Sequence, residues 1–423
     1  MIYAGSPSRL RLYTRLRDYF TVAKEFMLGR WNKGDDIGLL EQALCKKFQV
    51  KHTIMVPLAR VGIYLSLKHK IRPGQKVILS PYTIAEVVNM VIAAGGIPVF
   101  ADIDRNTCNI APRSIKKLLT EMKNEECGAV LATHFYGCSC DVVAIKAICD
   151  NHEVPLIEDA AQAFGLKIDG KASGTHGNAG IYSFGLFKNV TSFYGGAIVT
   201  NDDNFAQSIR KELSGWPELS VSFFIKKVIS GIMTDVVTWP PLFKSFSFRL
   251  FRYGLLNDVD FINNQTKIDI APTLNEILPD EYRHRLSPMQ ARLILPQINK
   301  SDDLSITRQN KARIYDEGFK NQQNFISPPS QDNVPNMYWY YTIQCDDREK
   351  LVKFAMKKGR DITMSYHRNC SNLPCYSEFY LDCPNAEKTA HSLIYLPLYP
   401  DYSDKEIHQN IAVINEYFQR NHN

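Results

Sequence analysis

The stretch PLIEDAAQAFGLKIDGKASGTHGNAGIYSFGLFKN, residues 155–189, contains two short apolar runs that each lead into polar residues. The runs VPLIEDA (154–160) and GIYSF (180–184) are predicted to be β-strands. Asp159 ends the first run, where a buried carboxylate is costly unless it meets a cation. Lys188 follows the second run, and its amine is either solvated or held in a pocket with a lowered pKa, able to attack a carbonyl.

Strand-like and helix-like patterns alternate around this stretch. Further strands are expected at 76–80, 97–104, 128–135 and 196–201, and helices at 83–96, 112–122 and 141–152. This alternation predicts an α/β fold with a mostly parallel central sheet covered by helices on both faces. Ligands bind beyond the carboxyl ends of the strands in such sheets, which is where His134, Glu158, Asp159 and Lys188 are expected.

The pattern changes after residue 205, which suggests a division into four parts. A long helix from 288, a strand-like run at 337–345 and a closing helix near 403–419 indicate a second, smaller α+β domain. The expected parts are an N-terminal arm (1–35), a large domain (36–205), an inserted amphipathic helical segment (206–280) and a small C-terminal domain (281–423).

Composition narrows the class of protein. The 423 residues are 45% hydrophobic with a net charge of +6, which is compatible with an anionic small substrate. Nucleic-acid binding is not expected, because Lys and Arg are not run together. The ten cysteines contain no CxxC pair, so we expect reduced thiols, no metal site and a cytoplasmic protein. The N-terminal stretch is expected to be neither a signal peptide nor a membrane span.

Three residues of the opening stretch together meet the needs of pyridoxal phosphate. Lys188 could form a Schiff base with its aldehyde, Asp159 could pair with the ring nitrogen, and Ser183 with nearby N–H groups could hold the phosphate. The alternative is that Asp159 caps the following helix and Lys188 is solvated. Spacing alone leaves both interpretations open.

The sequence resembles the DegT/DnrJ/EryC1/StrS family, the sugar aminotransferases of the fold-type-I pyridoxal-phosphate class. The resemblance covers about 40–220 and 280–415. It is carried by the opening stretch with GGAIVTND (195–202), and supported by SPYTIAEVVNMVIAAGGIPVFADID (80–104), HFYG (134–137), SPMQARL (287–293) and CPNAEKTAHSLIYLPLYP (383–400). The order and spacing of Asp-Ala-Ala-Gln and Ser-Phe-x-x-x-Lys are highly specific.

The resemblance implies a role for each matching residue. Lys188 matches the lysine that forms the Schiff base and moves the proton, and Asp159 matches the partner of the ring nitrogen. Gln162 matches a residue beside the ring, and Ser183 matches a phosphate ligand. Related dehydratases carry histidine in place of the lysine, so Lys188 favours transamination.

Three positions depart from the family pattern. Leu58-Ala59-Arg60 replaces Ser-Gly-Thr at the start of a helix, where Arg60 is either a direct phosphate ligand or a surface arginine. Ile84 replaces the aromatic residue that commonly covers the ring. Arg283 replaces an asparagine donated by the neighbouring subunit, which makes it a second cationic phosphate ligand unless the alignment is off by one residue.

The resemblance implies an aminotransferase that acts on a keto sugar, nucleotide-linked, with glutamate as the expected amino donor. Its implied setting is surface-polysaccharide or amino-sugar biosynthesis, and its implied assembly is a homodimer with a shared active site. Two alternatives remain at this point: a pyridoxal-phosphate-dependent sugar dehydratase, and a non-enzymatic regulatory or membrane-associated protein.

Residues 222–256 form an amphipathic, basic and aromatic segment. A helical hairpin packed on the partner subunit or over the substrate entrance is the favoured interpretation. The alternative is peripheral contact with a membrane, because such segments can lie in a lipid interface.

Overall fold

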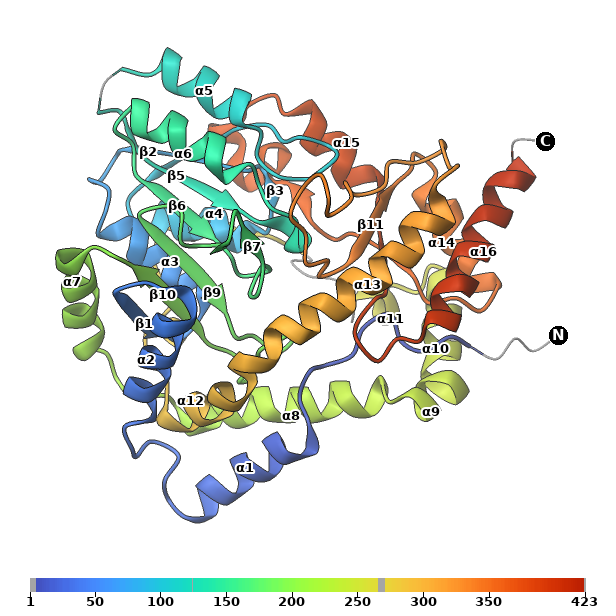
Figure 1. The fold of residues 1–423 in the computed structure, drawn as a ribbon, viewed down its shortest axis with the longest axis horizontal. Coiled ribbons are helices and arrows are strands. Elements are labelled where there is room, and N and C mark those ends of the chain that lie inside the picture. The colour runs from blue at the N-terminus through green and yellow to red at the C-terminus, as the bar shows by residue number, and fades with distance from the viewer. Residues whose placement is uncertain (1–4, 124, 265–270, 422–423) are drawn as a thin grey trace.

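The computed structural model describes residues 5–123, 125–264 and 271–421, so residues 1–4 of the expected arm and 265–270 of the expected insert lie outside the described residues. A seven-stranded sheet forms the large domain (Figure 1). Its order is β1 (His52–Val56), β10 (Gly196–Thr200), β9 (Ala179–Ser183), β6 (Leu156–Asp159), β5 (Cys127–Thr133), β2 (Lys76–Leu79) and β4 (Ile97–Phe100). Strands β9, β6, β5, β2 and β4 are parallel, while β10 is antiparallel to both neighbours. The predicted mostly parallel sheet is confirmed.

The strands are apolar because both faces of the sheet are covered. All seven residues of β5 are buried. Along this strand, Ala129 and Leu131 join one core cluster, while Val130 and Ala132 join the other. The first cluster receives side chains from α3 (Ala59–Lys68), α4 (Ala85–Ala93) and α7 (Asp203–Ser214), and the second from α2 (Asp36–Phe48), α5 (Pro112–Glu121), α6 (Val142–Asn151) and α12 (Pro288–Ile294).

The small domain is an antiparallel sheet with its own core. The sheet has the order β11 (Tyr341–Gln344), β14 (Leu393–Leu396) and β12 (Thr363–Met364). Its helices are α13 (Ser301–Phe319), α14 (Arg348–Lys357), α15 (Pro384–Ser392) and α16 (Asp404–Asn421). Two short strands, β13 (Arg368–Asn369) and β3 (Tyr82–Thr83), pair the small domain with the large one.

Two boundaries differ from the sequence predictions. The single helix expected from residue 288 is divided by a 3₁₀ turn, η4 (Leu295–Lys300), into α12 and α13. Pro296 explains the division, because proline lacks the N–H that an α-helix needs and its ring clashes with the preceding turn. The strand expected over 337–345 begins only at Tyr341.

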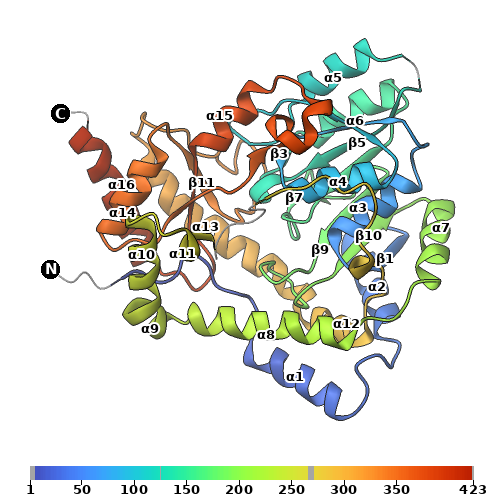
Figure 2. The same ribbon diagram turned by 180° about the vertical axis from the view of Figure 1, so that it is seen from behind.

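The inserted segment does not form the expected hairpin. It consists of α8 (Val221–Val237), α9 (Pro240–Leu242), the π-helical turn η2 (Phe243–Ser247), α10 (Phe248–Leu256) and α11 (Asp260–Asn264). Figures 1 and 2 show α10 standing beyond the end of α8 rather than alongside it. The physical reason is that α8 packs with α1 (Leu16–Met27) and α12, while Phe243 and Phe248 pack with Met356 of the small domain.

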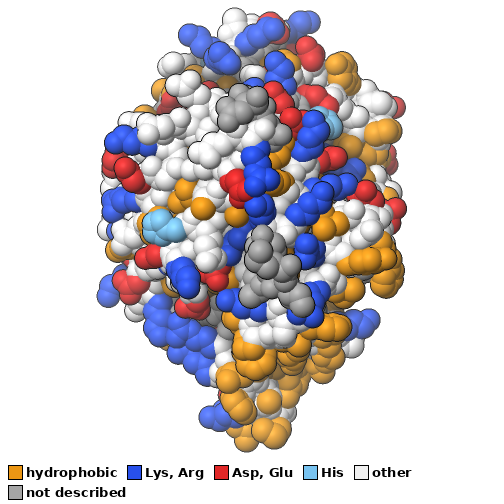
Figure 3. All heavy atoms as spheres, turned by 90° about the vertical axis from the view of Figure 1, so that its right-hand side faces the viewer, with side chains coloured by type: hydrophobic (Ala, Val, Ile, Leu, Met, Phe, Trp, Pro, Cys, Tyr) orange, Lys and Arg blue, Asp and Glu red, His pale blue; other side chains and the backbone are white. Residues whose placement is uncertain are grey.

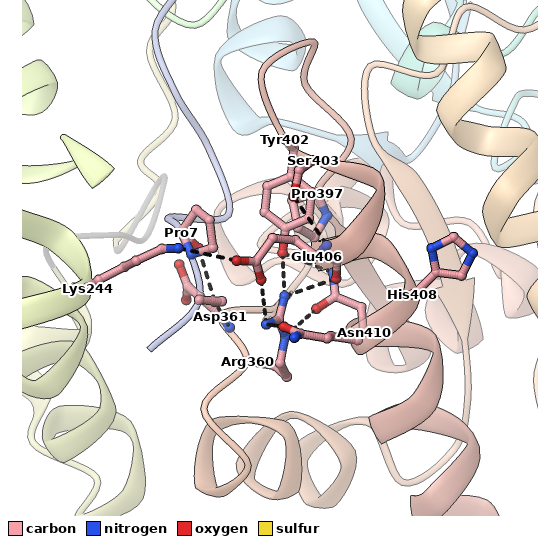
Figure 4. Close-up of polar contacts among 12 residues, drawn as sticks. Pro7, Lys244, Arg360, Asp361, Pro397, Tyr402, Ser403, Glu406, His408 and Asn410 are labelled. Carbon is pink, nitrogen blue, oxygen red and sulfur yellow. Dashed lines mark hydrogen bonds and ion pairs between the residues drawn. The ribbon is translucent and has the colours of Figure 1, made fainter. Parts of the chain in front are cut away.

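Polar contacts fasten the insert and the N-terminal arm to the small domain (Figure 4). Arg360 is buried and donates to Glu406 Oε2 at 2.6 Å and to Asn410 Oδ1 at 2.7 Å. Lys244 of the insert reaches the same Glu406 at 3.3 Å. The backbone N–H of Arg9 donates to Asp361 Oδ2 at 2.8 Å. These contacts hold both segments on the small domain.

Candidate active site

The site lies at the carboxyl edge of the sheet, between the two domains. Asp159 is the last residue of β6 and Ser183 the last residue of β9, and these two strands are parallel neighbours. Lys188 sits in the turn after β9, where its backbone N–H donates to Gly185 O at 3.0 Å. Parallel strands present their carboxyl ends at one edge, so the predicted lysine and aspartate meet there.

Lys188 is held in an environment that favours the neutral amine. Burial lowers the pKa of Lys188 to about 8; the carboxylate of Asp159 acts against this shift and the charge of Arg60 adds to it. The Lys188 Nζ lies 4.0 Å from the ring centroid of Trp339. Since the neutral amine is the nucleophile, about a tenth of Lys188 can react at pH 7, far more than for an ordinary lysine. Lys188 is thus partly buried against an aromatic ring, and its role as the Schiff-base lysine stays a prediction.

Asp159 is a buried carboxylate whose charge is only partly compensated. Its side chain accepts a hydrogen bond from the Ala161 N–H at 3.0 Å, and the residue is 6% exposed. Burial raises the pKa of Asp159, while the Ala161 N–H and the charge of Lys188 act against that rise. A cation placed against Asp159 would favour the charged form of this carboxyl group.

The neighbouring Glu158 has a structural role instead. It is fully buried and accepts hydrogen bonds from the backbone N–H groups of Gly174 at 2.8 Å, and of His176 and Gly177 at 2.6 Å. His134 Nε2 lies 3.1 Å from the same carboxylate, and His134 is fully buried. His134 is thus a core histidine, and Glu158 organises the loop that leads to β9.

Gln162 and Ser183 lie near the carboxyl edge of the sheet, and each side chain accepts one hydrogen bond from a backbone N–H. Gln162 Oε1 accepts from the Tyr136 N–H at 2.7 Å. Ser183 Oγ accepts from the Gly185 N–H at 3.3 Å. Both side chains are partly exposed, so they can reach a ligand, and their cofactor-binding roles stay predictions.

Gly196 brings the start of helix α3 close to Ser183. It is the register partner of Ser183, and a Cβ atom placed on Gly196 would come within 2.6 Å of the Ala59 nitrogen. The N-cap residue Leu58 provides no side-chain cap, so first-turn N–H groups of α3 remain available to an anion. This arrangement fits a phosphate next to Ala59 and Ser183.

Arg60 lies near this helix start but is engaged elsewhere. It pairs with Glu86, donates to Tyr282 Oη at 3.2 Å, and lies over the Tyr282 ring at 5.5 Å. Its charge still lowers the pKa of Lys188. A phosphate would have to compete with Glu86 for this guanidinium, so direct contact with Arg60 stays a prediction.

The predicted roles of Ile84 and Arg283 stay predictions. Ile84 is the N-cap of α4 and packs partly buried against the large-domain core. The Arg283 side chain is half exposed, with Asp280 Oδ1 4.0 Å from its Nε. The expected role of Arg283 belongs to a neighbouring subunit and is not tested in one chain.

Sequence reasoning missed residues that the small domain contributes. The Trp339 N–H donates to Tyr136 O at 2.7 Å and the indole Nε1 donates to Phe187 O at 3.3 Å, which fixes the ring over Lys188. His367 Nδ1 lies 2.9 Å from Tyr395 Oη and 3.2 Å from Tyr136 Oη. Burial, together with the charge of Lys188, lowers the pKa of His367 to about 4, so its imidazole is neutral near pH 7.

Buried hydroxyl groups link the two domains behind His367. Tyr82 Oη lies 2.8 Å from both Tyr136 Oη and Ser365 Oγ, and Ser365 Oγ lies 2.8 Å from Tyr395 Oη. Tyr82 and Tyr136 come from the large domain, and the other members from the small domain. The network fixes one domain against the other at the edge of the site.

A lysine of lowered pKa, a buried carboxylate and an open helix start are the features expected of a pyridoxal-phosphate site on an α/β scaffold. A sequence model of the DegT/DnrJ/EryC1/StrS aminotransferase family matches residues 18–219 and 270–415. The chain belongs to this family and is therefore a pyridoxal-phosphate-dependent aminotransferase. This assignment sets aside the non-enzymatic alternative.

Known proteins agree with the family and the fold. The spore coat polysaccharide biosynthesis protein SpsC of Bacillus subtilis is 28% identical over 399 residues, covering 92% of this chain and 91% of SpsC. The aminotransferase PseC of Helicobacter pylori, involved in the biosynthesis of pseudoaminic acid, superposes with a TM-score of 0.72 over 99% of both chains at 20% identity. An aminotransferase from Psychrobacter cryohalolentis has a TM-score of 0.76 at 19% identity, covering 97% and 98% of the two chains.

Proposed function

We propose that this enzyme moves the amino group of an amino acid, glutamate, to the ketone of a nucleotide-linked sugar for surface-polysaccharide or amino-sugar biosynthesis. Support comes from the family and from relatives whose names state such roles. SpsC is a spore coat polysaccharide biosynthesis protein, PseC takes part in pseudoaminic acid biosynthesis, and DesI was solved in the presence of its TDP-sugar product.

The observation that carries the proposal is that Lys188 and Asp159 lie near enough at one sheet edge for the charge of each to shift the pKa of the other. Bound pyridoxal phosphate supplies an aldehyde that accepts an amine and a ring that withdraws electrons. Lys188 Nζ, with its pKa lowered to about 8, can attack that aldehyde and can accept and return a proton. The Asp159 carboxylate would keep the ring nitrogen protonated, because a buried anion favours a cation beside it.

The remaining predicted residues would hold and orient the cofactor. The Ala59 N–H, the other first-turn N–H groups of α3 and Ser183 would bind the phosphate, with Arg60 adding a positive charge. Gln162 and Ile84 would lie against the ring. In a homodimer with a shared active site, Arg283 of one subunit would reach the phosphate bound in the other.

A two-stage assay tests the proposal. The purified enzyme with bound cofactor is mixed with glutamate alone, and the loss of the visible absorption band with formation of 2-oxoglutarate reports the first half-reaction. A nucleotide keto sugar is then added, and mass spectrometry is used to find the amino sugar. A deoxy sugar product would instead favour the dehydratase alternative. No reaction with glutamate, but reaction with another amino acid, would correct the donor only.

A further inference from the structure

Helix α8 presents an unpartnered apolar stripe at one end of the molecule. The stripe residues recur at intervals of three and four, which places them on one side of the helix. They are between 41% and 62% exposed: Ile225, Ile229, Ile232, Met233 and Val236. The adjoining side of α8 is buried through Phe224 and Val228. Other residues therefore anchor α8 to the rest of the protein, and the exposed stripe is not needed for that packing.

Helix α1 adds a second stripe next to it. Leu16, Phe20 and Met27 are 77%, 72% and 81% exposed, and their spacing also places them on one side of the helix. The other side of α1 packs through Val22 into the same cluster as Phe224 of α8. We name the two stripes together the α1–α8 face.

Figure 3 shows hydrophobic side chains gathered over the lower end of the molecule, where Figure 1 places α1, α8 and α9. Trp239, between α8 and α9, is 56% exposed. A contiguous apolar surface of this kind marks an interaction site.

The exposed charges that accompany this face have one sign. On α1 and α8 the exposed charged side chains are all basic: Arg17, Lys24, Lys226 and Lys227. The acidic residues of these segments are withdrawn from the surface. Asp18 and Glu25 are each 5% exposed, and Asp235 is bound by Arg11, Thr14 and Tyr19. The partner surface should therefore carry negative charge.

The charge pattern distinguishes two candidate partners for the α1–α8 face, a second copy of the chain and an anionic lipid bilayer. In a two-fold contact with a second copy, the same surface meets itself, so the basic side chains would be brought together without acidic partners. An anionic bilayer satisfies both features, because its acyl region takes up the apolar stripes and its headgroups meet the Lys and Arg side chains.

We propose that the α1–α8 face docks this enzyme on the surface of an anionic lipid bilayer. The helices would lie in the interface. Among the described residues, no helix is long and apolar enough to cross a membrane. Docking through this face is expected whichever sugar the enzyme aminates.

Vesicle co-sedimentation of the full-length enzyme with bound cofactor tests the proposal. Vesicles of phosphatidylcholine are compared with vesicles that also contain phosphatidylglycerol. We expect binding to the phosphatidylglycerol vesicles at low salt, weaker binding as salt is raised, and little binding to phosphatidylcholine alone. Absence of binding to phosphatidylglycerol vesicles at low salt overturns the proposal.

Surface variants identify the face responsible. Phe20→Ser combined with Met233→Ser should weaken binding about tenfold or more, because both side chains would leave the acyl region. Lys226→Glu with Lys227→Glu should remove the preference for phosphatidylglycerol. The matched control is Val143→Ser, since Val143 is 51% exposed on α6 and should leave binding unchanged.

Light scattering on the same variants tests whether the face is instead the contact between two copies of the chain. If Phe20→Ser with Met233→Ser dissociates an oligomer and leaves vesicle binding intact, the face lies between two copies and the proposal is wrong. Retained circular dichroism and cofactor absorbance in each variant show that the fold is preserved.

Discussion

The Nζ atom of Lys188 lies 4.0 Å from the ring centroid of Trp339, so the small domain covers the reactive amine of the large domain. An aromatic face attracts an ammonium, which by itself would raise the pKa of lysine. Burial is the larger effect, because the net result is a pKa of about 8 for Lys188. Burial under this cover therefore raises the share of neutral, reactive amine at any given pH.

This relationship makes a pH prediction for the enzyme freed of cofactor. The neutral fraction of Lys188 falls about tenfold for each pH unit below its pKa. The rate at which pyridoxal phosphate becomes covalently attached should therefore rise up to a pH of about 8 and then level off. Stopped-flow absorbance measures this rate. A rise that continues to pH 10 would mean that Lys188 titrates as an ordinary lysine.

Trp339→Ala should move the midpoint of that pH profile upward. Water would reach the amine and the pKa of Lys188 would return toward its ordinary value of 10.5. Trp339→Phe is the control, because it keeps an apolar ring over the lysine and should change the midpoint much less. An unchanged midpoint in Trp339→Ala would assign the pKa shift to Arg60 and the surrounding loop instead.

Lys188→Ala should abolish turnover and leave the fold intact. Borohydride reduction followed by peptide mass spectrometry should find the cofactor attached to Lys188 in the parent enzyme and nowhere in the variant. Lys188→Arg serves as a control that keeps a cation at this position but lacks a usable nucleophile. Full turnover of Lys188→Ala with added pyridoxal phosphate would remove the lysine from the chemistry.

The parallel sheet and its catalytic edge could be predicted from the sequence, because local patterns set them. The apolar runs and helix signals place Asp159 and Lys188 after neighbouring strands, and parallel pairing then brings them together. Their roles needed the family resemblance, since spacing alone left the solvated alternative open.

The small-domain part of the site could not be predicted in this way. Trp339 and His367 lie far along the chain from Lys188, and only the packing of one domain on the other brings them near it. The apolar residues of 337–345 continue through Trp339 and predict one strand, but Tyr338 has a φ of 51°, which no strand permits.

Asp159→Asn and Glu158→Gln should separate catalysis from stability. Asp159→Asn removes the charge that faces Lys188, so turnover should fall strongly while the melting temperature changes little. Glu158→Gln weakens bonds from three backbone N–H groups, so it should cost about 1.5–3 kcal/mol of unfolding free energy. Steady-state kinetics and thermal unfolding measure the pair. Equal turnover for Asp159→Asn and the parent enzyme would exclude Asp159 from the mechanism.

The ion pair between Arg60 and Glu86 gives the last prediction. If Arg60 supports the cofactor phosphate, Arg60→Ala should weaken pyridoxal-phosphate affinity about tenfold or more, since a charge-assisted contact contributes about 1.5–3 kcal/mol. Arg283→Ala should do the same if Arg283 acts across a dimer.

Glu86→Gln provides the opposite change. It frees Arg60 from a competing carboxylate, so affinity for pyridoxal phosphate should rise, and the rise should disappear when Arg60→Ala is added. Affinity is measured by fluorescence titration of the cofactor-free enzyme, with Arg313→Ala as a surface-arginine control on α13. Parent-like affinity in both Arg60→Ala and Glu86→Gln would leave the phosphate to Ser183 and the first turn of α3, without help from Arg60.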